Sequence, residues 1–396
     1  MKFLVQCLLL ILWCLSVPSL APAAELVLGM STALSGPTAE LGGAMRDGVR
    51  LGLEHFNREG GIHGRRLRLV ALDDGYEPAR TAPNMRRLIA EEQVLAVIGN
   101  VGTPTAIASL PLIRERRVLF YAPFTGAGVL RQEPPDRYVI NYRASYGEEI
   151  GAMIDALVRQ AGLKPSEIGF FTQRDGYGDA GYVGGFAALQ RYGLDDERQV
   201  LHVRYPRNTL AVENALADVL LAEKPPRAII MVGAYAPCAK FVRLARAAGL
   251  RSLFLSVSFV GGDFLAEALG EDMDGVIVTQ VVPHPEDRHL PLVDAYRRDL
   301  EEFAKDLSPN FVGLEGYIAA RLLGLALERM SGEPDREALI DALEGLGRFD
   351  LGLGRPLELS PERHQASREV WPTLLRRGRL IPFDWTRIAA LVPEAP

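Results

Sequence analysis

Three loops in the first part of the sequence place hydroxyl side chains next to glycine or proline. They contain Ser35-Gly36-Pro37, Thr103-Pro104-Thr105 and Thr125-Gly126. Glycine lets the backbone approach a small molecule closely, and a hydroxyl group can donate to a carboxylate or an amide oxygen. Ser-Gly-Pro is also a good turn sequence, and the third loop can be a simple glycine-rich turn. Ligand contact and plain turn structure therefore both explain these residues.

The second loop has the composition of a helix start. Thr103 fits the cap position and Pro104 the first helical position, so that backbone N–H groups and the positive helix end point beyond the preceding strand. An anionic group such as a carboxylate would be held there by charge-assisted hydrogen bonds. A capped helix with water in that place explains the same residues equally well.

A fourth loop, residues 174–181, formally matches the dinucleotide pattern G-x-G-x-x-G. In a nucleotide site an acid normally ends the following strand. Here Asp195 and Asp196 precede that strand instead, so a nucleotide site is poorly supported. We expect a tight turn that presents Tyr177, with Asp179 near the start of a helix, where its charge is favourable.

Signatures of catalysis and metal binding are missing from the sequence. It contains no G-x-S-x-G, H-E-x-x-H, P-loop or C-x-x-C pattern. The histidines are scattered, and His284 and His289 have the wrong spacing for two metal ligands on one helical face. Cys238 follows Pro237 at the start of an apolar helix and is expected to be a small buried residue. The sequence therefore predicts no catalytic residue, no metal site and no cofactor.

Short apolar strands alternate with amphipathic helices over most of the chain, which predicts parallel sheets with helices on both faces. The expected strands are residues 26–30, 67–72, 95–98, 118–121, 168–172, 200–203, 228–232, 253–256 and 275–281. An irregular stretch, residues 130–145, divides them into two groups. After residue 281 the chain turns helical and ends in a mixed tail, which we expect to return to an earlier lobe. In such sheets, ligands bind beyond the carboxyl ends of the strands.

Composition and the first residues point to an exported globular protein. The chain has 396 residues, 48% hydrophobic and 24% charged, with a net charge of −6, which argues against nucleic-acid binding. Residues 1–23 have the pattern of a secretory signal peptide, with Lys2, an apolar run and Ala21-Pro22-Ala23. Cleavage would remove Cys7 and Cys14, so no disulfide would remain possible within the chain.

An ordered set of motifs resembles the leucine/isoleucine/valine-binding protein family, the type I periplasmic solute-binding proteins of ABC importers. It runs from residues 34–37 through Asn57-Arg58-Glu59-Gly60-Gly61-Ile62-His63-Gly64 to Asp73-Asp74 and Tyr177-Gly178. The resemblance implies an α/β fold of two Rossmann-like lobes with parallel sheets joined by a three-crossing hinge, which closes on the ligand. The first lobe would comprise residues 25–142 plus 281–355, and the second residues 143–280 plus 356–396.

The resemblance also implies a set of ligand-binding positions. Those matching the family are Thr103, Thr125, Gly126, Tyr177 and Tyr235, and Ser35 is a further candidate from its position in the first loop. The acid that pairs with the ligand's ammonium group falls at Ser258, the aromatic residue of the first-lobe wall at Leu41, and the two disulfide cysteines near Tyr76 and Gly102. An unpaired ammonium in a closed cleft costs several kcal/mol. Unless Asp263 replaces the missing acid, specificity for branched-chain amino acids is not expected.

The resemblance implies a periplasmic, monomeric solute-binding component of an ABC importer, with an inner-membrane permease as its partner. Its ligand would be a small organic molecule that is amino-acid-like or bears a carboxylate or amide group. No nucleic acid is involved, and the protein is not expected to be an enzyme. The alternatives are an extracytoplasmic ligand sensor on the same scaffold and an enzyme that uses the cleft between the lobes.

Overall fold

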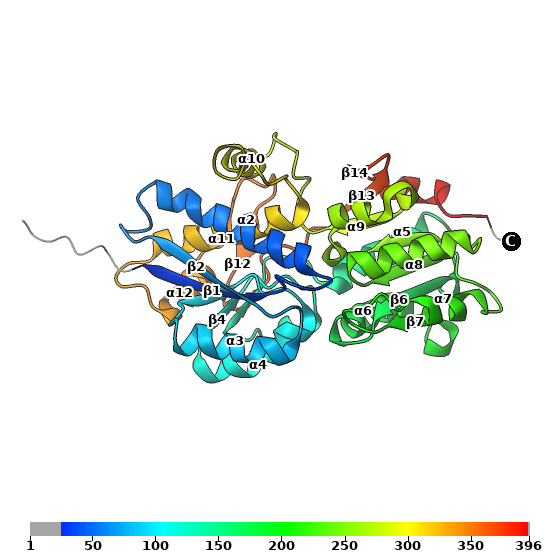
Figure 1. Cartoon of the computed structure of the whole chain (residues 1–396), viewed down its shortest axis with the longest axis horizontal. Coiled ribbons are helices and arrows are strands. Elements are labelled where there is room, and N and C mark those ends of the chain that lie inside the picture. Colours follow the sequence, from blue (N-terminus) through cyan, green and yellow to red (C-terminus); the bar gives the residue numbers. More distant parts are fainter. Residues whose placement is uncertain (1–24, 395–396) are drawn as a thin grey trace, which may run out of the picture.

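The computed structural model describes residues 25–394, so the expected signal peptide lies outside the described residues. Two α/β lobes lie side by side along the long axis of the molecule (Figure 1). One lobe holds a five-stranded sheet, the other a seven-stranded sheet, and a two-stranded sheet lies apart from both. Among the described residues, no helix is both long enough and apolar enough to cross a membrane. The expected two-lobe α/β fold is confirmed.

The sheet of the first lobe is wholly parallel, with strand order β2-β1-β3-β4-β5. Its strands are β1 (Leu26–Thr32), β2 (Leu67–Asp73), β3 (Ala96–Ile98), β4 (Leu119–Tyr121) and β5 (Val139–Ile140). The chain first builds outward from β1 to β2 and then continues on the other side of β1 with β3. In open parallel sheets, ligands bind at the carboxyl ends of the strands at such a switch point, which here lies between β1 and β3.

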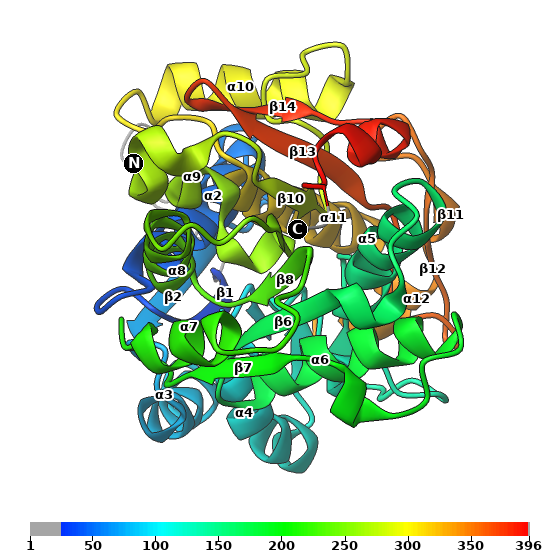
Figure 2. The same cartoon turned by 90° about the vertical axis from the view of Figure 1, so that its right-hand side faces the viewer.

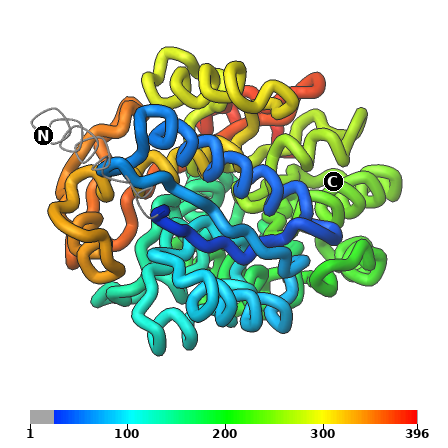
Figure 3. Tube along the Cα trace, turned by 60° about the vertical axis from the view of Figure 1, so that its left-hand side comes forward, coloured from blue at the N-terminus to red at the C-terminus, as the bar shows by residue number. Residues whose placement is uncertain are grey.

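Helices cover both faces of the first sheet (Figures 1 and 3). They are α2 (Ala39–Arg58), α3 (Pro78–Ala90), α4 (Thr103–Arg116), α10 (Pro291–Phe303), α11 (Phe311–Arg329) and α12 (Arg336–Glu344). Helices α3 and α4 contact each other, and α2 packs along α11. The small sheet pairs β11 (Gly347–Phe349) with β12 (Leu357–Leu359).

The sheet of the second lobe has the order β14-β13-β10-β9-β8-β6-β7. Its strands are β6 (Ile168–Gln173), β7 (His202–Tyr205), β8 (Ala228–Val232), β9 (Leu253–Ser256), β10 (Ile277–Gln280), β13 (Trp371–Arg376) and β14 (Arg379–Pro382). Strand β13 lies antiparallel beside β10, and β14 lies antiparallel beside β13 at the edge of the sheet (Figure 2). Its α-helices are α5 (Tyr146–Arg159), α6 (Gly176–Gln190), α7 (Glu213–Leu220), α8 (Tyr235–Ala247) and α9 (Gly262–Leu269).

Six short 3-10 helices complete the described secondary structure. They are η1 (Gly128–Leu130), η2 (Pro165–Glu167), η3 (Glu197–Gln199), η4 (Ser258–Val260), η5 (Gly270–Met273) and η6 (Trp385–Ala390).

The chain passes between the two large sheets three times, after β5, after β10 and before β13. The first and third passages are bonded to each other, since Ala366 N–H donates to the Asn141 carbonyl at 2.9 Å and Ser367 N–H to the Tyr142 carbonyl at 2.8 Å. Strand β12 pairs with β11, and the chain joins the second sheet at Trp371. The lobe limits given above stay a prediction.

Candidate functional site

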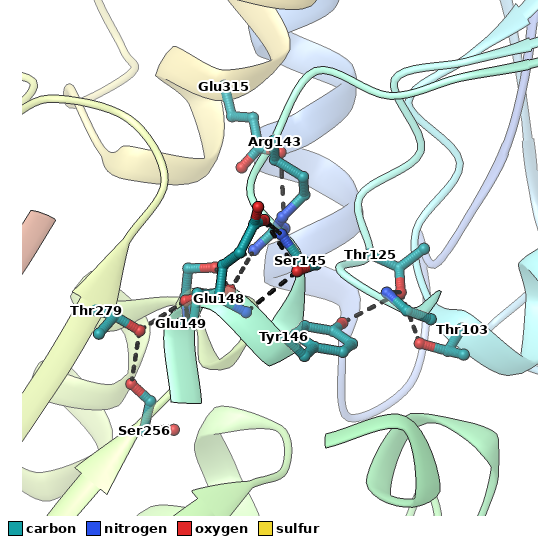
Figure 4. A network of polar contacts seen from close by, with 12 residues as sticks. Thr103, Thr125, Arg143, Ser145, Tyr146, Glu148, Glu149, Ser256, Thr279 and Glu315 are labelled. Atoms are coloured by element: carbon teal, nitrogen blue, oxygen red, sulfur yellow. Dashed lines mark hydrogen bonds and ion pairs between the residues drawn. The ribbon is translucent and has the colours of Figure 1, made fainter. Parts of the chain in front are cut away.

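Three buried hydroxyl groups meet where the lobes face each other (Figure 4). Thr103 begins α4, Thr125 follows β4, and Tyr146 begins α5 of the second lobe. The Thr103 and Thr125 Oγ1 atoms are 2.6 Å apart, and Thr125 Oγ1 lies 3.2 Å from the Tyr146 hydroxyl. We call these residues the hydroxyl cluster. The two contacts inside the cluster use two of its three O–H groups, which leaves one O–H to donate to an acceptor where the lobes meet.

The Thr103 hydroxyl is free for this cluster because Thr103 is not the helix cap. The capping prediction was wrong: α4 begins at Thr103, and Gly102 takes the cap position with φ at 105°. Only glycine adopts such a backbone readily, and a Cβ here would lie 2.1 Å from Cε2 of Tyr76. Positions 76 and 102, where the family's cysteines align, are thus in contact, and a tyrosine ring lies against a glycine.

Gly126 allows α5 to approach the first lobe. The Tyr146 N–H donates to the Gly126 carbonyl at 2.8 Å. A Cβ on Gly126 would lie 2.6 Å from the Tyr146 nitrogen. Any larger residue at position 126 would therefore push the two lobes apart beside the hydroxyl cluster.

Aromatic side chains form the apolar part of the site. The ring of Phe259, in η4, lies 4.5 Å from that of Tyr177, 5.2 Å from Phe124 and 6.1 Å from Tyr76, centroid to centroid. Tyr177 is also 5.3 Å from Tyr146. All five side chains are buried. Phe124 and Tyr76 come from the first lobe, so this aromatic cluster joins the two lobes.

Tyr177 lies in a helix and not in the tight turn that the sequence predicted. Helix α6 begins at Gly176, and the Asp175 carboxylate caps it by accepting from the Tyr177 N–H at 2.9 Å. A Cβ on Gly178 would lie 1.9 Å from the Gln173 carbonyl oxygen. Gly178 therefore lets the helix pack against the end of β6.

A buried ion cluster forms another wall of the site. The expected acid aligns with Ser258, and in the structure a carboxylate from α5 lies beside this residue. The Ser258 N–H and hydroxyl donate to Glu149 at 2.8 and 3.0 Å. Thr279 also donates to Glu149, at 2.6 Å. The Arg143 guanidinium donates to both Ser258 and Glu149. It lies 3.6 Å from Glu315 of α11, so the cluster links both lobes through the first passage (Figure 4).

Burial controls the charges of this cluster. Burial raises the pKa of Glu315 to about 7, although Arg143 opposes this effect. Burial also raises the pKa of Glu149. Burial disfavours the charged form of Arg143, but the carboxylates of Glu315 and Glu149 together raise its pKa. Arg143 is therefore a permanent buried cation, and its Nε and Nη1 atoms have no hydrogen-bond partner among the described residues.

The remaining predicted positions lie apart from the hydroxyl cluster. Ser35 is exposed and donates to Asp73 at 2.6 Å. Tyr235 is half-buried and packs against Phe264. Asp263, the alternative acid, accepts from the Phe311 N–H at the start of α11 at 3.0 Å.

Outside this site, the described residues hold one free cysteine and no cluster of metal-ligating side chains. Cys238 is free and buried in α8, as expected. No group of three or more histidine, cysteine or acidic side chains in residues 25–394 is arranged to hold a metal ion.

The architecture is that of a two-lobed binding protein, with polar and aromatic side chains gathered between the lobes. The sequence profile of the family described as periplasmic binding protein matches residues 25–379. The chain belongs to this family, which confirms the resemblance.

Several relatives are similar over most of their length. A solved structure of a possible leucine/isoleucine/valine-binding protein from Rhodopirellula baltica SH 1 is 49% identical, with a TM-score of 0.90 over 93% of this chain and 98% of that one. A substrate-binding periplasmic protein from Ralstonia solanacearum is 30% identical, with a TM-score of 0.80 over 88% and 97% of the two chains. The Leu/Ile/Val-binding protein homolog 7 of Brucella abortus is 26% identical over 375 residues, which cover 88% of this chain and 89% of the relative.

Proposed function

We propose that this chain is the periplasmic solute-binding component of an ABC importer and that it captures a small organic ligand between its lobes. The observation that carries the proposal is the hydroxyl cluster, because Thr125 and Tyr146 come from different lobes and lie 3.2 Å apart. A ligand that accepts from this cluster, where the two lobes meet, would favour the closed arrangement. Such contacts shift the population toward closure without any bond being made or broken.

The ion cluster bears on the class of ligand. The four donors on Glu149, from Ser258, Thr279 and Arg143, leave little acceptor capacity for a ligand ammonium. The fixed cation of Arg143 would also repel an ammonium group. We therefore infer that the ligand bears a carboxylate or an amide-like acceptor and that it is not a branched-chain amino acid.

A ligand screen with two readouts tests this function. Small carboxylates, amides and amino acids are added to the purified protein, and its melting temperature and radius of gyration are measured. A ligand should raise the melting temperature with the logarithm of its excess over Kd and should reduce the radius of gyration. Chemical turnover of the bound compound, or stabilisation by nucleotides alone, would contradict the proposal.

A further inference from the structure

A groove of about 640 Å³ lies between the lobes, beside the hydroxyl cluster. Thr103 and Gly126 line it on the side of the first lobe, and Gly176 and Val183 of α6 line it on the side of the second. Helices α4 and α6, which face each other across the lobes in Figure 1, are in contact here. Thr103 is buried and Val183 is exposed, so the groove runs from the edge of the hydroxyl cluster to the surface; Thr125 and Tyr146 do not line it.

The outer part of this groove is apolar although it faces solvent. Ile107, Val129 and Val183, which line it, are 43%, 41% and 67% exposed. They are three of the seven large apolar side chains that are exposed among the described residues. Ile107 lies four residues after Thr103, on the same face of α4. Gathered exposed apolar side chains of this kind mark a binding surface more often than isolated ones do.

The acidic residues Glu148 and Asp179 of the groove are paired within the protein, whereas Arg131 forms no ion pair among the described residues. Arg131 donates to the carbonyls of Ala127 and Arg143, each at 3.0 Å. Asp179 is paired with Arg204 at 2.5 Å, and Glu148 with Arg368 at 3.6 Å. The outer part of the groove therefore presents mainly hydrocarbon surface to a ligand. Polar recognition at the inner end is left to the hydroxyl cluster and to the Arg131 guanidinium, which also donates to the Thr125 carbonyl at 3.4 Å.

We propose that the groove is an apolar subsite that takes the hydrocarbon chain of a monocarboxylate whose head group binds to the hydroxyl cluster. The proposal rests on the proposed function, because it extends the same site. Thr103 belongs to both the hydroxyl cluster and the groove lining, so the carboxylate head group and the hydrocarbon chain of the ligand would lie along one face of α4. Because the walls come from both lobes, a longer chain would bury more surface only when the lobes are closed, and this couples chain length to closure.

A series of straight-chain carboxylates tests the subsite. Binding of butyrate, hexanoate and octanoate to the full mature chain is measured by calorimetry. Affinity should rise by up to about fourfold for each added methylene, which is the gain from burying one CH₂ group. Equal affinity for butyrate and octanoate would overturn the proposal.

Two variants locate the chain within the groove. Val183→Asp should weaken octanoate at least tenfold and leave butyrate within twofold. The matched control is Leu221→Asp, because Leu221 is an apolar residue of the second lobe that is 83% exposed and does not line the groove; it should change neither affinity. If Val183→Asp weakens both ligands equally, or neither, the proposal fails.

The series also separates this proposal from the proposed function. If amino acids or amides raise the melting temperature and compact the protein while none of the carboxylates binds, the subsite is overturned and the binding function stands. If no compound in the screen does either, both are overturned.

Discussion

Gly102 decides what Thr103 can do. Because Gly102 takes the cap of α4 with its positive φ, the Thr103 hydroxyl lies against Thr125 and not against its own helix. Thr105 donates instead to the carbonyls of Val101 and Gly102, at 2.5 and 2.9 Å. A single residue without a side chain thereby converts a helix start into part of a site.

Removing one hydroxyl of the cluster should weaken the ligand found in the screen. Thr103→Val and Thr125→Val keep the side-chain shape and should each lower affinity by roughly 1 to 2 kcal/mol, the loss of one buried hydrogen bond. Thr386→Val, at an exposed position remote in sequence, is the control. Calorimetry that shows unchanged affinity in both cluster variants would contradict the site.

Glu315 makes stability depend on pH. Its pKa is raised from 4.5 to about 7 in the folded chain by burial. The folded state therefore binds more protons than the unfolded state between these values, and the free energy of unfolding should fall as pH rises from 4.5 through 7. Arg143 and Glu149 face Glu315 in the cluster, and Arg131 and Tyr142 are its further charged or titratable neighbours.

The variant Glu315→Gln tests this linkage. Its free energy of unfolding should depend less on pH than that of the natural chain, by roughly 1 to 3 kcal/mol across the same range. Urea unfolding at a series of pH values measures the difference. Parallel curves for the two proteins would show that another group is responsible.

The sequence predicted part of this site. Thr103, Thr125, Gly126 and Tyr177 were identified from loop position and resemblance, and the structure brings them together with Tyr146. Arg143, Glu149 and Glu315 were missed as site residues. From sequence alone, a charged residue is predicted to lie at the surface, because the distant partner that allows its burial is not known. A signal was present, since Glu149 lies on the same apolar helix face as Tyr146 and Ile150.

At the scale of elements, the packing of α2 on α11 holds the first lobe together. Gly48 and Gly52 of α2 face the backbone of α11, and a Cβ on Gly48 would lie 2.0 Å from the Gly313 carbonyl oxygen. The helices therefore approach each other more closely than side chains would allow. The first turns of α11, which carry Glu315, depend on this close approach for their position beside Arg143.

Two alanine variants of one helix distinguish packing from helix propensity. Gly48→Ala should lower the free energy of unfolding by roughly 1 to 3 kcal/mol, because the added Cβ overpacks the contact. Gly43→Ala places its Cβ where nothing lies within 4 Å. It should raise the free energy of unfolding by up to about 1 kcal/mol. Urea unfolding of both would contradict this explanation if Gly48→Ala proved as stable as Gly43→Ala.

The order of helices and strands was largely predictable, because apolar runs and amphipathic stretches alternate along the chain. The start of α6 was not. Glycines at 176 and 178 favour a turn when propensity alone is considered, whereas in the structure Gly178 lets the helix pack against β6 and Gly176 lies against Ile107 of α4. Tertiary packing of this kind cannot be read from local sequence.

At the scale of the whole molecule, polar contacts join the lobes at the rim of the cleft. Arg207 and Asn208 of the second lobe bind Glu77 of the first at 2.8 and 2.6 Å. Asn208 also donates to the Gly75 carbonyl at 3.1 Å. These contacts stabilise the closed arrangement without belonging to the hydroxyl cluster.

Weakening the rim should therefore lower affinity at a distance. Glu77→Gln should raise the Kd of any cleft ligand about two- to fivefold, the value of a partly exposed ion pair, and added salt should reduce the difference. Glu213→Gln removes a pair with Lys240 that lies within the second lobe and should leave the Kd unchanged. Equal effects of the two variants would mean that the rim contacts do not govern closure.

The insertion of β13 beside β10 sets the order in which the molecule can be completed. Strand β10 pairs with a strand that lies almost a hundred positions later in the sequence: Ile277 pairs with Leu374 and Gln280 with Trp371. A growing chain therefore exposes the open edge of β10 until residues 371–376 are made. Loss of residues 371–382 would remove two strands of the second sheet and leave that edge open, so the completion of the second lobe depends on a segment distant in the sequence.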